Sequence, residues 1–136
     1  MWRAVAACLV AFLFLLAFVA PVSGAPPGAV QASIAPEATL VDAGAGVLVR
    51  VTVSCAGGSN VLEAFVYVTQ DGQQSWPYTP IPVRCGGPAR TYTVRVPAPE
   101  GTVFHVGTAS ASGYVLVDRH GNVTSASPSQ TLTITE

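Results

Sequence analysis

A stretch of regular alternation between positions 46 and 55 places the strongest constraint on how this chain can fold. In the segment GVLVRVTVSC, every second residue is a valine or the final cysteine, and most residues between them are polar. Successive side chains of a β-strand point to opposite faces, so one face of such a strand would be apolar. That face is suited to a protein core, and it would carry Val47, Val49, Val51, Val53 and Cys55.

Alternating segments recur along the rest of the chain and are separated by residues typical of turns. Further strands are expected at 30–35, 61–70, 90–96, 103–118, 123–127 and 131–135, with 103–118 forming one long strand or two. Segment 76–82 contains three prolines, which restricts it to an edge strand or an extended loop. About seven or eight short strands joined by turns predict an all-β, antiparallel two-sheet sandwich.

The direction of each side chain follows from the same alternation. In segment 61–70 the aliphatic set is expected to face the core, which leaves Phe65 and Tyr67 on a half-exposed face. The residues expected to point inward from the later strands and from this one are Leu62, Ala64, Val66, Val68, Tyr92, Val94, Val96, Leu132 and Ile134.

The N-terminal residues 1–25 read as a signal peptide. Arg3 gives a basic start, and residues 4–20 contain neither a charge nor a proline. Ser23 and Ala25 are small, as signal peptidase requires at three places and one place before the cut. Cleavage after Ala25 is therefore expected.

Other readings of this segment remain open. A cut after Gly24 is a close alternative, because a proline directly follows Ala25. An uncleaved anchor is the main competing reading, since about 17–20 apolar residues can span a bilayer. Lipid attachment at Cys8 is a third. Cleavage after Ala25 would leave residues 26–136 as one β-sandwich domain.

Two cysteines remain after such a cut, and they are interpreted as a structural disulfide. A redox pair would normally be spaced Cys-x-x-Cys, whereas Cys55 and Cys85 are 30 positions apart. A structural zinc site needs four ligands, and only His105 and His120 could join them, without ligand spacing. Exported compartments are oxidising, so a Cys55–Cys85 bridge is expected, with no metal and no cofactor.

The charged residues exclude one class of partner. The expected mature chain has five arginines, no lysine and seven acidic residues, a net charge of −2. No cluster of basic residues is present that could neutralise phosphates, so nucleic acid is not an expected partner.

No constellation in the sequence points to catalysis. His120 and Asp118 lie in one hairpin turn, and no serine sits in a Gly-x-Ser-x-Gly elbow. His105 is expected to be half-buried or solvated on a strand. The carboxylates are scattered over different turns and strands, which does not favour a glycosidase pair. The chain is therefore expected not to be an enzyme.

Four aromatic residues form the candidate ligand surface. Phe65, Tyr67, Trp76 and Tyr78 would lie on neighbouring strands at one face, where rings can bind sugars or flat apolar ligands. Ordinary packing at the sheet edge is the competing interpretation. The partner is expected to be a protein, a glycan or a small apolar ligand.

The segment GYVLVDRHGNVTSASPSQTLTI resembles the closing hairpin of bacterial immunoglobulin-like and fibronectin type III-like domains. The whole chain is similar to small secreted actinobacterial proteins of unknown function, which share an Ala-rich leader, a cysteine that ends an early strand, and a Phe-x-x-Gly-x-Ala strand, here 104–109. This resemblance implies an immunoglobulin-like β-sandwich with an extracellular location and no assigned catalytic residues.

The expected function is that of a secreted, non-enzymatic binding or cell-envelope accessory module, with no membrane attachment after cleavage. A weaker resemblance to the enediyne-carrying apoproteins implies a small-molecule carrier, although those proteins use two disulfides and this chain has one expected bridge. A carbohydrate-binding module is the other alternative.

The expected cleavage gives a direct prediction. Exported protein should begin at Pro26, because Ser23 and Ala25 occupy the positions that the peptidase reads. N-terminal sequencing of the culture supernatant would measure this. A start at Ala25 would move the cut by one residue, and a chain that retains Met1 in the membrane fraction would contradict cleavage.

Overall fold

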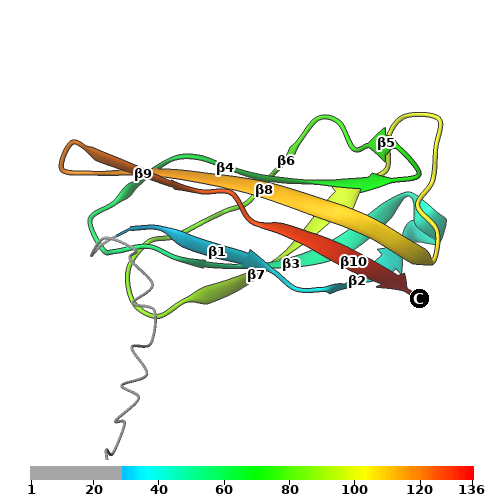
Figure 1. Ribbon diagram of the computed structural model, residues 1–136, viewed down its shortest axis with the longest axis horizontal. Helices are drawn as coiled ribbons and strands as arrows, with labels where there is room; N and C mark the ends of the chain where they lie inside the picture. The colour runs from blue at the N-terminus through cyan, green and yellow to red at the C-terminus, as the bar shows by residue number, and fades with distance from the viewer. Residues whose placement is uncertain (1–28) are drawn as a thin grey trace, which may run out of the picture.

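The computed structural model describes residues 29–136, and the expected signal peptide at residues 1–25 lies outside the described residues. Ten strands and a short 3-10 helix, η1 (Asp42–Gly44), are arranged in two layers (Figure 1). The first layer comprises β1 (Gln31–Ile34), β2 (Glu37–Val41), β3 (Gly46–Ser54) and β7 (Arg90–Pro97). The second comprises β4 (Asn60–Gln70), β5 (Gln73–Gln74), β6 (Thr79–Pro80), β8 (Gly107–Arg119), β9 (Asn122–Ala126) and β10 (Ser129–Thr135).

The strand pairing confirms the all-β sandwich and adds one feature. In the first layer β3 pairs with β7 on one side and with β1 and β2 on the other. In the second, β8 lies between β4 and the two strands β9 and β10, while β5 and β6 pair with the outer edge of β4. These pairs are antiparallel, but β2 also pairs with β10 in parallel, so hydrogen bonding continues from one layer into the other.

The parallel pair depends on a break in the first strand at Pro36. Ala35 still donates its N–H to the Arg50 oxygen of β3 at 2.9 Å, whereas the Pro36 oxygen accepts the N–H of Thr133 on β10 at 2.8 Å. The chain thus starts along β3 and then also reaches β10. Sequence reasoning ended this strand correctly before Pro36 but did not predict β2, where only Ala38 is fully buried.

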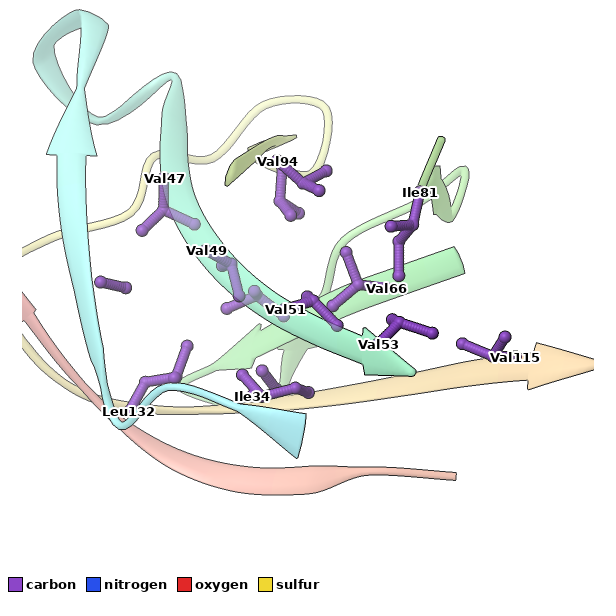
Figure 2. Close-up of a cluster of buried hydrophobic side chains, with 14 of the residues drawn as sticks. Ile34, Val47, Val49, Val51, Val53, Val66, Ile81, Val94, Val115 and Leu132 are labelled. Atoms are coloured by element: carbon purple, nitrogen blue, oxygen red, sulfur yellow. The ribbon is translucent and has the colours of Figure 1, made fainter. Parts of the chain in front are cut away.

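The apolar face of β3 forms the centre of the core, as the alternation predicts. Val47, Val49 and Val51 have no exposed surface, and Val53 is 3% exposed. The inward side chains of the second layer lie opposite them (Figure 2). The predicted inward direction is confirmed for Val66, Val68, Leu132 and Ile134 of the second layer and for Val94 and Val96 on β7 of the first layer. Tyr92 on β7 is half-buried against the core.

One predicted core residue, Leu62, is exposed instead, with 55% of its surface accessible. A register shift in the β4–β8 pair falls between Val61 and Glu63, so one extra residue is inserted into β4 at this point. Val61 packs against the core in its place, and Ala64 continues the inward set. The bulge thus changes which residue of the N-terminal part of β4 faces inward.

The start of the long 103–118 segment also differs from the prediction. The strand is single but begins at Gly107, and residues 103–106 belong to the preceding loop. Phe104 is buried in this loop, and its N–H bonds the Gly44 oxygen at 2.8 Å. Gly44 has φ +91°, and an added Cβ would collide with the Phe104 carbonyl oxygen, so this contact requires glycine.

The predicted Cys55–Cys85 disulfide is confirmed. The two Cα atoms lie 4.8 Å apart, and the bridge ties the end of β3 to the loop that leads into β7. Beside it the Gly86 N–H donates to the Cys55 oxygen at 2.9 Å. Gly86 has φ +105°, a conformation that favours glycine, so the chain can turn away sharply after the bridge.

Replacing both Cys55 and Cys85 by Ala should lower the free energy of unfolding by about 2–5 kcal/mol, because the unfolded chain regains the freedom of a closed loop. The double variant should still fold at low temperature around the buried face of β3. Denaturant unfolding of both proteins, with and without reductant, measures the difference. If the variant and the oxidised wild-type protein had equal free energies of unfolding, a structural role for the bridge would be contradicted.

Candidate functional site

The four aromatic residues selected from the sequence lie together on the outer side of the second layer, and a fifth joins them. Tyr78 stacks against Phe65 at 4.7 Å and against Tyr67 at 4.8 Å between ring centroids. Trp76 meets Tyr78 edge-on at 4.9 Å, and Tyr114 contacts Phe65 at 5.8 Å. We call these five residues the aromatic cluster.

Two of these rings come from a short arch beside β4. The chain pairs with β4 first as β5 and again as β6. Residues 76–78 between them leave the edge of β4, and we call this segment the arch. Ser75 holds one end, because its N–H donates to the Val68 oxygen and its hydroxyl accepts the Val68 N–H, both at 2.9 Å. Ile81 holds the other end, with its side chain in the core and its N–H on the Ala64 oxygen at 3.0 Å.

The remaining rings follow from the β4–β8 register. Phe65 and Tyr67 share the outer face of β4 because they are two residues apart, and Tyr114 is the direct cross-strand partner of Phe65. Val66 between them is fully buried. The inward packing of β4 therefore holds the two rings on the outer face, beneath Tyr78 of the arch.

A groove of about 360 Å³ runs beside the aromatic cluster. Its floor is the segment 112–114 of β8, and one wall is formed by Phe65, Tyr67 and Tyr78. The other wall is segment 127–129, which runs from the end of β9 to the first residue of β10. Serine hydroxyls line the floor and the far wall. The groove thus combines ring surfaces with hydrogen-bonding groups, a composition suited to ligands that have both apolar and polar faces.

The far wall exists because the chain that pairs with β8 is interrupted opposite the aromatic cluster. β9 and β10 both pair with β8, and Pro128 separates them. The Pro128 oxygen still accepts the Gly113 N–H at 2.9 Å. A Cβ at Gly113 would lie 3.3 Å from Pro128 Cγ and 3.2 Å from the Phe65 oxygen, so the bare glycine lets this wall approach the floor closely.

Sequence reasoning found the rings of β4 and the arch but missed Tyr114 and the serine wall. The alternation in segment 103–118 places Tyr114 outward, a signal that was present in the chain. That Tyr114 faces Phe65 depends on the pairing of strands about 50 residues apart, which periodicity in one strand does not reveal.

One charged contact lies at the far end of β4. His105 Nε2 and Asp71 Oδ2 are 2.5 Å apart, and both side chains are largely exposed. The Asp71 carboxylate accepts a hydrogen bond from the His105 ring, and together with the Val106 oxygen it raises the pKa of His105 above its ordinary value of 6.5. The contact between protonated His105 and Asp71 therefore contributes fully to the stability of the fold below pH 6.5, and this contribution disappears as the pH rises through the raised pKa of His105.

The loop that carries His105 is fixed by a buried amide. The Gln70 side chain donates to the His105 oxygen at 2.9 Å and accepts the His105 N–H at 3.0 Å. This pair of bonds holds the loop against the end of β4, so the His105–Asp71 contact is built on a rigid support.

The catalytic and metal-binding candidates from the sequence do not lie in the aromatic cluster. Asp118 accepts the Gly121 N–H at 3.0 Å in the hairpin turn beside His120. Within residues 29–136, no three His, Cys, Asp or Glu side chains gather where they could hold a metal ion. In that same part of the chain, no helix has the length and apolar character needed to cross a membrane.

No protein-family profile matches the chain, and no curated protein matches it significantly.

The anchor of the arch gives a testable prediction. Ser75→Ala should lower the free energy of unfolding by about 1–3 kcal/mol, because the buried Val68 N–H loses its hydroxyl acceptor. Denaturant unfolding followed by circular dichroism measures the loss.

Ser59→Ala provides the matched control. The Ser59 hydroxyl is also buried but has no hydrogen-bond partner, so its removal should leave stability unchanged or slightly increased. The same loss in both variants would show that the arch does not depend on the Ser75–Val68 bond.

Proposed function

We propose that this protein is an exported, non-enzymatic binding module that recognises glycans with the aromatic cluster and its groove. The single observation that supports this best is the close grouping of five aromatic rings beside serine hydroxyls on one sheet face. Pyranose rings have faces rich in C–H groups and edges rich in hydroxyls. Aromatic rings pack against those faces, while hydroxyl groups bond to the edges.

The exposure of Trp76 also supports a binding role. Its side chain is 69% exposed, although it is one of the largest apolar groups in the chain. It lies edge-on against Tyr78 at the margin of the groove, where a ligand can cover it. A ring that served only to fill the sheet edge would be expected to bury more of its surface.

The filled interior favours this surface over a carrier with a cleft between the sheets. The space between the two layers, where such a cleft would lie, is occupied by side chains without exposed surface, among them Val49, Val66 and Val115. The outer groove is open and has serine hydroxyls beside its aromatic rings, which suits a ligand with both apolar faces and polar edges better than a wholly hydrophobic chromophore. The disulfide accords with an extracellular site of action.

Affinity electrophoresis in gels that contain soluble neutral polysaccharides tests the proposal. The wild-type protein should be retarded by at least one of them, and Trp76→Ala should weaken that binding about tenfold through loss of the exposed ring. Val123→Ala is the control, because Val123 is 57% exposed at a hairpin remote from the arch and should bind like the wild type.

Two results would contradict the proposal. One is the absence of retardation by every polysaccharide in the panel. The other is a Trp76-dependent binding of a small apolar dye without any effect of glycans, which would favour the small-molecule carrier.

A further inference from the structure

The outer face of the second layer continues beyond the groove as two rows of hydroxyl groups. Thr69, Ser110 and Thr131 are cross-strand neighbours on β4, β8 and β10 and form the first row. Thr108 and Thr133 are paired in the same way and form the second. We call these five residues the hydroxyl rows. They are exposed or half-exposed, because the residues that alternate with them face the core.

The hydroxyl groups of these rows are free to bind a ligand. On the outer face of the first layer, the facing Thr52 and Thr91 hydroxyls bond to each other at 2.8 Å. Within residues 29–136, none of the side-chain hydrogen bonds involves a hydroxyl group of the hydroxyl rows, although the backbone oxygens of Thr108 and Thr131 each accept one from a glutamine. Each hydroxyl therefore keeps one donor and its acceptor capacity for water or a ligand.

The strip from the aromatic cluster to the last row is long and uncharged. Tyr114 and Thr108 are six residues apart on β8, a distance of about 20 Å along an extended strand. Charged groups lie at the margins of the strip: Glu63 beyond the rings, the Asp71–His105 contact beyond Thr69, and Glu37, the partner of Thr133 on the neighbouring strand β2, which faces Arg50 at 4.0 Å. An anionic glycan would need arginine or lysine on this strip, and the strip has neither.

We infer that the ligand is an uncharged linear polysaccharide, bound so that one sugar packs in the aromatic groove and the following sugars extend over the hydroxyl rows. This inference rests on the proposed glycan-binding function and adds the charge, length and direction of the ligand. A strip of about 20 Å is several sugar rings long, so a single sugar would leave most of it uncovered.

The test measures binding of neutral cello-, manno- and xylo-oligosaccharides, from disaccharide to hexasaccharide, to the full protein by isothermal titration calorimetry. In the series that binds, the hexasaccharide should bind about tenfold more tightly than the disaccharide, because it reaches additional hydroxyl groups. Oligogalacturonates of the same lengths should bind more weakly than the neutral series.

Thr131→Val isolates the contribution of the hydroxyl rows. Valine keeps the branched shape and removes only the hydroxyl, so it should weaken hexasaccharide binding several-fold and leave disaccharide binding unchanged. Thr93→Val on the exposed face of β7 is the matched control and should change neither. Trp76→Ala should weaken both ligands, since its ring lies at the aromatic end.

The outcomes separate this inference from the function on which it rests. Disaccharide and hexasaccharide binding of equal strength, weakened by Trp76→Ala but not by Thr131→Val, would overturn the extended ligand and leave glycan binding in place. Preference for oligogalacturonates would overturn the uncharged ligand. Failure of every oligosaccharide and polysaccharide to bind would overturn both.

Discussion

β3 pairs with three other strands and directs its valine face towards the second layer. The burial of this face organises the rest of the molecule, because β4, β8 and β10 must present complementary apolar residues to it. Once Val66 and Val68 point inward to meet the valines of β3, the period of two sends Phe65 and Tyr67 outward. The candidate site thus lies on the outer face of the same sheet whose inner face forms part of the core.

The bulge at Leu62 and the two proline-containing interruptions, at Pro77 and Pro128, then shape this outer face. The bulge adjusts the N-terminal part of β4, so that Val61 and Ala64 can both contact the core. Segments 76–78 and 127–128 depart from the edges of β4 and β8, and the groove lies between them. A flat sheet face would offer the same residue types but no walls against which a ligand could be held.

Sequence periodicity was sufficient wherever a strand is regular and one face is buried. It predicted the inward sets of β3, β7 and β10 and the half-exposed position of Phe65 and Tyr67, while the spacing of the cysteines and the expected export predicted the disulfide. It failed where a local irregularity or a distant partner decides the outcome. Leu62 lies on a bulge, β2 contributes one fully buried residue, and Tyr114 joins the site through a pairing that one strand alone does not encode.

The edge beside β4 has a consequence for self-association. β5 and β6 are two residues each, and Pro77, Pro80 and Pro82 in this part of the chain have no N–H to offer. A strand from another molecule cannot form a continuous hydrogen-bonded ladder along such an edge, which is how many β-proteins avoid growing into fibrils. The prolines that frame the arch therefore also disfavour strand pairing between copies of this protein at this edge.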